Sequence, residues 1–209
     1  MKSYPLFAHV PLSDTKIEAG EKALYRFSVK AVGGDVAIYK FTFNVGSSTV
    51  AATTSNHKLF AYSDSGFSSA DTNFSSTGQL NQEIYGGTVR QPHNILETYP
   101  FKNSATTTYV IGSGDTKYFA LKGTFSNLRT TTGSESITIS LLGDAAYPVR
   151  ISNTSILTRS EGSTHLMGAA AGGIDSDTND KFIWSPVSTT TQNTINDLDF
   201  SNGYQVQGL

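Results

Sequence analysis

The sequence predicts an all-β protein, an antiparallel β-sandwich of immunoglobulin-like or Greek-key (jelly-roll) type. Several short segments alternate apolar and polar residues with a period of two, as strands with one buried face do. Glycine-containing turns separate these segments, as in all-β domains, and no segment shows the 3.6-residue period of a capped helix. Of 209 residues, 26 are Ser and 26 are Thr, a composition that suits half-buried strands and turns.

The clearest strand signal comes from two neighbouring alternating runs. In Lys22–Ala31 (KALYRFSVKA), Tyr25, Phe27 and Val29 share one face. The run VAIYKFTFNV at 36–45 follows after the turn Gly33-Gly34-Asp35. Two alternating runs around a short glycine turn predict a β-hairpin.

Further strands are predicted along the rest of the chain, at His57–Ser63, Thr107–Ile111, Lys117–Phe125, Glu135–Leu142, Tyr147–Ser152, Ser155–Thr158, Phe182–Val187 and Gly203–Leu209. The interval Asp64–Pro100 is rich in Ser, Gly and Asn but carries several aromatic residues, and it is predicted to be one long loop region. A loop of that length is either functional or packed on itself.

Residues 15–209 are predicted to form a single β-sandwich domain. Residues 1–14 are expected to be a linker or an N-terminal strand, because SYPLFAHVPL is apolar and precedes the first turn-bounded strand. That segment is either an ordinary first strand of its own sheet or a strand donated to a neighbouring molecule. Pro5 and Pro11 suit an edge position in both cases, since proline has no N–H to donate to a neighbouring strand.

Composition narrows the function. Charged residues make up 15% of the chain and the net charge is −2, which argues against a nucleic-acid partner because that needs a clustered basic footprint. No apolar run approaches 18 residues, so we expect no membrane span. The chain has no Cys, hence no disulfide and no thiolate metal site. The start lacks the apolar region of a signal peptide, and we expect the chain to be part of a longer protein.

No pattern indicates catalysis. The chain has no G-x-S-x-G elbow, and its four His residues are scattered and interpreted as surface or strand-edge residues. GSGD at 112–115 lacks the Lys and Ser/Thr of a phosphate-binding loop and precedes a strand, so it is interpreted as a turn. We therefore predict a protein that is not an enzyme and requires no cofactor.

The segment DSDTND offers a candidate calcium site. Asp175, Asp177, Asn179 and Asp180 place oxygen ligands close together, and Ca²⁺ takes six to eight of them. The segment departs from an EF-hand loop, since Asp180 stands where glycine is needed and Pro186 where the bidentate Glu is needed. Two interpretations stay open: a solvated acidic turn, or a Ca²⁺ site at the edge of the sandwich.

Aromatic residues of the long interval offer a second candidate site. Phe67, Phe74, Tyr85 and Tyr99 would form a platform for a glycan if their rings are exposed. The alternative is that they belong to the core.

Three stretches together resemble a known kind of module: AGEKALYRFSVKAVGGDVAIYKFTFNV, LFAYSDSGFSSADTNFSSTGQLNQ, and DKFIWSPVSTTT with the closing DFSNGYQVQGL. They resemble a β-sandwich module of long, uncharacterised, secreted cell-surface proteins of ultra-small bacteria with reduced genomes, over about Thr15 to Leu209. The family usually has a tryptophan before the closing Asn-Gly, where this chain has Phe200-Ser201.

The resemblance implies an extracellular domain at the cell surface, without catalytic residues. We therefore expect a non-enzymatic structural or adhesive module of a cell-surface protein or filament. Its partners would be copies of itself or other cell-envelope proteins, reached through protein–protein contacts or strand addition. The alternative is a ligand-binding module that recognises a glycan or depends on Ca²⁺.

Overall fold

A computed structural model describes residues 3–47, 53–73, 75–80, 93–97, 108–126, 128, 136–142 and 182–187. Within these ranges the chain is all-β and every strand pairing is antiparallel, which confirms that part of the prediction. No helix that could span a membrane occurs in the described ranges. The strands are β1 (Tyr4–His9), β2 (Gly20–Val32), β3 (Val36–Lys40), β4 (Thr42–Ser47), β5 (Thr53–Tyr62), β6 (His93–Glu97), β7 (Tyr109–Ile111), β8 (Thr116–Ser126), β9 (Ile137–Leu142) and β10 (Ile183–Pro186).

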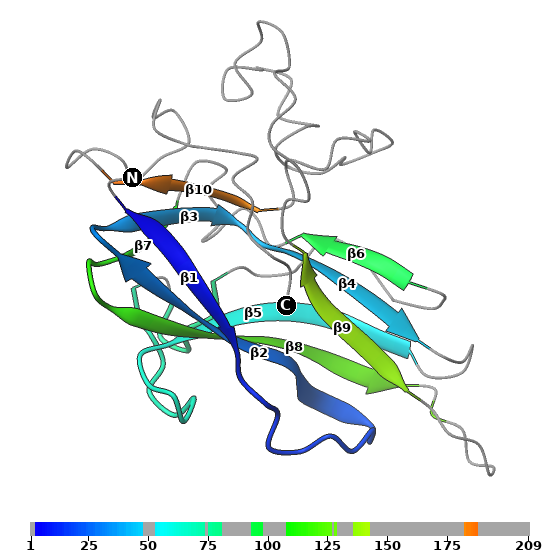
Figure 1. The fold of residues 1–209 in the computed structure, drawn as a ribbon. Helices are drawn as coiled ribbons and strands as arrows, with labels where there is room; N and C mark the ends of the chain where they lie inside the picture. Colours follow the sequence, from blue (N-terminus) through cyan, green and yellow to red (C-terminus); the bar gives the residue numbers. More distant parts are fainter. Residues whose placement is uncertain are drawn as a thin grey trace, which may run out of the picture.

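The strands form three sheets (Figure 1). The four-stranded sheet has the order β1-β2-β8-β5, and the three-stranded sheets have the orders β10-β3-β7 and β6-β4-β9. Only Phe41 separates β3 from β4, so one continuous stretch of chain supplies the central strand of both smaller sheets.

Aromatic side chains join the four-stranded sheet to the β3–β4 stretch. The Phe27 ring of β2 lies 5.1 Å from the Phe41 ring and 5.9 Å from the Phe43 ring, centroid to centroid, and none of the three is exposed. Phe119 of β8 stacks on Phe27 at 5.2 Å and meets Phe41 edge-on at 5.3 Å. Such contacts add to the large apolar area that each ring buries. One main core therefore forms between these strands.

The predicted hairpin at 22–45 is wrong. β2 pairs with β1 and β8, whereas β3 pairs with β10 and β7. The turn at Gly33-Gly34-Asp35, where Gly33 has φ +81°, carries the chain from one sheet to another. The physical reason is that the aromatic faces of the two runs pack on each other, and alternation predicts which face is buried but not which strand lies alongside.

Several other strand predictions are confirmed. β5, β7, β8, β9 and β10 fall on predicted strand segments, and β1 lies within the apolar N-terminal segment and pairs with β2 of the same chain, from Tyr4↔Val32 to His9↔Phe27. The long-loop prediction is wrong at β6, whose five residues HNILE are too few and too polar to show a period. The strands predicted at Tyr147–Ser152, Ser155–Thr158 and Gly203–Leu209 lie outside the described residues.

The segment after β5 folds back onto that strand. Asp71 N–H donates to Ala61 C=O at 2.9 Å, Gly78 C=O accepts from Ala61 N–H at 2.8 Å, and Leu80 N–H donates to Leu59 C=O at 2.9 Å. The described part of the predicted loop up to Leu80 is therefore packed on the strand before it, with Leu80 fully buried.

Gly78→Ala is expected to lower the free energy of unfolding by about 1–3 kcal/mol. Gly78 has φ +76°, and a Cβ there would lie 2.5 Å from the Ala61 carbonyl oxygen. Urea unfolding measures the loss, with Gly114→Ala as the control: Gly114 has φ +83° but nothing within 4 Å of its would-be Cβ. Equal losses in the two variants would contradict the steric part of the argument.

Candidate functional site

Of the four aromatic residues predicted to bind a ligand, the structure describes Phe67. Its half-buried ring lies 5.4 Å from the Tyr62 ring and 5.9 Å from the Tyr118 ring, and the Arg26 guanidinium carbon stands 4.5 Å over it. The structure thus brings Phe67 to the four-stranded sheet. The other predicted residues, Phe74, Tyr85 and Tyr99 for a ligand and Asp175, Asp177, Asn179 and Asp180 for Ca²⁺, lie outside the described residues.

A compact turn at Asp64 positions Phe67. The Asp64 carboxylate accepts hydrogen bonds from the backbone N–H groups of Gly66, Ser68 and Ser69, and from the Ser68 hydroxyl at 2.8 Å. These bonds, first the one from Ser69, hold the pKa of Asp64 below its usual value. They also stabilise the left-handed backbone of Phe67, which has φ +57°.

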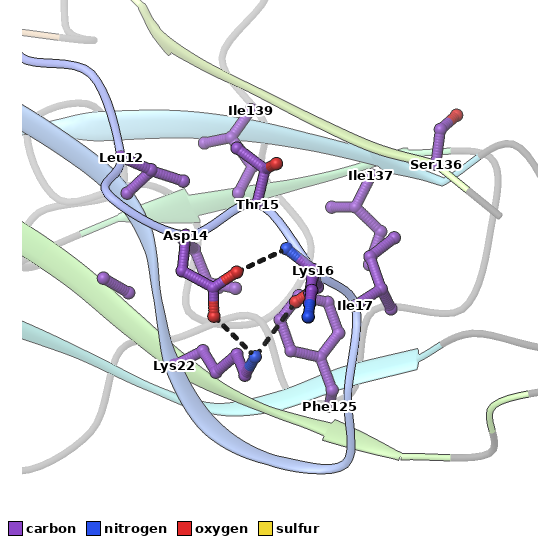
Figure 2. A pocket seen from close by; sticks show the side chains of 12 residues that line it. Leu12, Asp14, Thr15, Lys16, Ile17, Lys22, Phe125, Ser136, Ile137 and Ile139 are labelled. Carbon is purple, nitrogen blue, oxygen red and sulfur yellow. Dashed lines mark hydrogen bonds and ion pairs between the residues drawn. The ribbon is translucent and has the colours of Figure 1, made fainter.

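A cavity of about 250 Å³ lies where the loop before β2 meets the end of β8 and the start of β9 (Figure 2). Its apolar lining is Leu12, Ile17, Ala23, Leu24, Phe125, Ile137 and Ile139, and its polar lining is Asp14, Thr15, Lys16, Lys22 and Ser136. The volume is slightly below the range of about 300–1,000 Å³ for small-molecule sites.

Two charged groups at the rim of this cavity, Lys22 and Asp14, satisfy each other. Lys22 Nζ donates to Asp14 Oδ2 at 3.0 Å, to Glu18 Oε2 at 2.9 Å and to the Lys16 carbonyl at 3.2 Å, which uses all three of its donors. The Glu18 and Asp14 bonds raise the pKa of Lys22, while the Lys16 N–H and then Lys22 lower the pKa of Asp14. These contacts hold the loop in place and leave neither the Lys22 charge nor the Asp14 charge to a ligand.

His9 and His57 form no catalytic pair open to a substrate. His57 was predicted at the surface or a strand edge, which is wrong, because its side chain is buried and only 1% exposed. Its Nε2 lies 3.0 Å from Thr54 Oγ1, a spacing that suits a base and a nucleophile. Both side chains are buried, so a substrate in solvent does not reach them. His9 is exposed, with its ring 5.2 Å from the Tyr25 ring. In the described ranges no three His, Asp or Glu side chains gather into a metal site.

A largely buried ion pair between Lys117 and Asp71 was not predicted. Lys117 Nζ lies 2.6 Å from Asp71 Oδ2, and the Tyr109 hydroxyl donates to the same oxygen at 2.7 Å. The Asp71 side chain is 4% exposed and the Lys117 side chain 19%. Neither residue carries a sequence signal, because the partners are 38 and 46 positions apart.

The remaining candidate is the free edge of β1, the outermost strand of the four-stranded sheet (Figure 1). Pro5 stands opposite Ala31. Ala31 uses both backbone groups on its other side: its N–H donates to Asp115 C=O and its C=O accepts from Gly114 N–H, each at 3.0 Å. Opposed residues of an antiparallel pair exchange both hydrogen bonds or neither, so the Pro5 carbonyl faces the free edge.

The same rule places the other backbone groups of β1. Val10 N–H donates to Arg26 C=O at 3.0 Å, which fixes the even-numbered positions as those bonded to β2. The N–H and C=O of Phe7 and His9 therefore point to the free edge with the Pro5 carbonyl. Within the described residues no strand covers them.

Exposed apolar side chains also mark β1. Only three large apolar side chains in the described ranges are exposed: Tyr4 (38%), Leu6 (54%) and Val110 (39%). Two of them belong to β1, at alternate positions that share the outer face of the sheet. A free edge beside exposed apolar side chains is suited to pairing with another chain.

No protein-family model and no curated protein sequence matches the chain. Among solved structures, the chain is similar to AvmM, which is described as catalysing macrocyclization in alchivemycin A biosynthesis. The identity is 13%, the match covers 68% of this chain and 73% of that chain, and the TM-score is 0.27. A TM-score this low carries no argument about fold or activity.

Proposed function

We propose that this protein is a non-enzymatic structural module of an extracellular cell-surface assembly, and that it associates with copies of itself through β1. We propose also that its sheets form a β-sandwich of immunoglobulin-like or jelly-roll type. The observation that carries the proposal is the edge of β1, where no described strand pairs with the outward backbone groups, beside exposed Tyr4 and Leu6.

Two copies of β1 are self-complementary in an antiparallel arrangement centred on Phe7. Each Phe7 would exchange both backbone hydrogen bonds with its counterpart, and each His9 N–H would donate to the opposite Pro5 carbonyl. The missing N–H of proline therefore removes only the outermost bond at each end. On the outer face, Leu6 would lie opposite the small Ala8 of the other copy. Such a pairing has two-fold symmetry and joins two four-stranded sheets into one.

Leu6→Lys is expected to abolish this association. The charge replaces an apolar contact at the edge, a substitution by which natural proteins prevent strand pairing. Light scattering between about 1 µM and about 1 mM should show the wild-type protein forming dimers or larger species, and Leu6→Lys remaining monomeric at least tenfold higher in concentration.

Val110→Lys is the matched control, because it places the same charge on an exposed apolar position of a different sheet. It should associate as the wild-type protein does. A wild-type protein that stays monomeric over the whole range, or equal loss of association in both variants, would overturn the proposal.

A further inference from the structure

The outer face of the four-stranded sheet carries a second, smaller hydrophobic cluster, separate from the main core. Phe60, Tyr62 and Ala120 are buried there, with Phe67 and Tyr118 packed against them. Because side chains alternate along a strand, residues next to core positions Phe27, Val29, Phe119 and Leu121 project from this face. The face therefore consists of aromatic rings and their polar strand neighbours.

Cations are held over these rings. Lys122 Nζ lies 4.3 Å from the centroid of the Phe60 ring, and the Arg26 guanidinium carbon lies 4.5 Å from that of Phe67. Lys30 and Lys58 project from the same face. Cation–π contacts fix long side chains that would otherwise be mobile, so the charges are preorganised.

Three of these four cations lack carboxylate partners in the part of the chain that the structure describes. Among the described residues, Glu21 pairs with Lys58 at 3.6 Å, and no ion pair involves Arg26, Lys30 or Lys122. The Arg26 Nε is buried and has no hydrogen-bond partner there. A protein of net charge −2 thus gathers uncompensated positive charge on one sheet face.

The strand register places two of the lysines next to each other, where their charges repel. Lys58 and Lys122 stand directly opposite each other on β5 and β8. Like charges at directly opposed positions destabilise a sheet. Glu21 offsets the charge of Lys58, and an anion bound between the two lysines would also offset the charge of Lys122. Arg26 stands opposite Ala120, which stands opposite Phe60, so the guanidinium lies one row from the two lysines.

We propose that this face binds a carboxylated polysaccharide, a polymer of uronic-acid type, through Arg26, Lys58 and Lys122. Arginine offers a planar fork that binds a carboxylate with two hydrogen bonds, and lysine adds further charge. Hydroxyl groups of Ser28, Tyr118 and Thr124 lie on the same face and suit sugar hydroxyls. Nucleobases would need open ring faces for stacking, and Arg26 and Lys122 cover those of Phe67 and Phe60. This binding goes beyond self-association at β1.

Calorimetry with oligomers of polygalacturonate tests the proposal. Polygalacturonate is expected to bind and neutral dextran is not. The affinity for polygalacturonate should fall roughly tenfold between about 50 and about 200 mM salt. Arg26→Gln and Lys122→Gln should each weaken binding at least threefold, and the double variant more than tenfold. Arg26→Lys keeps the charge but loses the fork, so it should fall between the wild-type protein and Arg26→Gln.

Lys16→Gln is the control, since it removes one charge from an exposed residue of the loop before β2. It should bind as the wild-type protein does, and urea unfolding of each variant separates loss of binding from loss of fold. No binding of polygalacturonate by the folded wild-type protein, equal weakening by Lys16→Gln, or equal affinity for polyglutamate or single-stranded DNA would overturn the proposal.

Discussion

Asp71→Asn is expected to lower the free energy of unfolding by about 3–5 kcal/mol. The substitution keeps the shape of the side chain but leaves the Lys117 ammonium without its carboxylate, 2.6 Å away in the structure. Burial alone would raise the pKa of Asp71, but hydrogen bonds from Lys117, Tyr109 and the Asn73 N–H outweigh it and hold the pKa below its usual value. Burial and the nearby carboxylate raise the pKa of Tyr109, so its hydroxyl stays protonated and donates. Urea unfolding at neutral pH measures the loss.

The double variant Asp71→Asn/Lys117→Met separates the pair from the fold around it. Removing both charges should recover at least half of the loss, because the larger part of the effect is the unpaired and largely buried ammonium of Lys117. Glu18→Gln, which breaks an exposed ion pair with Lys22, should leave unfolding close to that of the wild-type protein. A double variant no more stable than Asp71→Asn would contradict this account.

The periodicity of the sequence correctly predicted which residues within a strand face the core. In β2, β5 and β8 the alternation fixes which residues face the core, and Phe27, Leu59 and Phe119 are all fully buried. It could not predict how strands are paired. The faces of 22–31 and 36–45 suit a hairpin or two strands packed face to face, and the structure has the second because Phe27 meets Phe41 and Phe43.

Irregular geometry explains another difference. The β5–β8 register shifts between Ser55 and Lys58, and Asn56 has φ +51°. A bulge of this kind changes the direction of the side chains around it, and the His57 side chain is buried against Gly123 of β8. Nothing in the run SNHKLF signals that bulge.

The candidate sites depend on distant contacts that no motif carries. Phe67 was predicted from its aromatic type alone, and its place on the sheet follows from the Asp64 turn and from Tyr62 and Tyr118. The outer-face cations come from three strands, and the lack of a described carboxylate partner for Arg26, Lys30 and Lys122 becomes visible only once the register aligns those strands. The free edge of β1 likewise follows from the order of the sheet and not from the apolar character of the strand.

His57 is expected to make the fold sensitive to acid. Its ring packs against Gly123 of β8, where a Cβ would lie 3.1 Å from His57 Cδ2, and its Nδ1 has no hydrogen-bond partner among the described residues. Burial lowers the pKa of His57 from 6.5 to about 4. The unfolded chain therefore takes up a proton at a higher pH than the folded protein does. This contribution to stability is complete above about pH 6.5 and is lost as the pH falls toward 4, by about 3 kcal/mol in all.

Urea unfolding of wild-type protein and His57→Gln between pH 7 and pH 4 isolates this contribution. Glutamine can still hydrogen-bond to Thr54 but carries no charge, so the variant should lose less stability than the wild-type protein over the same interval, with a difference of about 3 kcal/mol. Carboxylates such as Asp71 also titrate toward the acid end, but they do so in both proteins and cancel in the difference. His9→Gln, at an exposed position, should follow the wild-type curve. Parallel curves for wild-type protein and His57→Gln would show that water or local opening reaches His57 in the folded state, and that its burial does not oppose protonation.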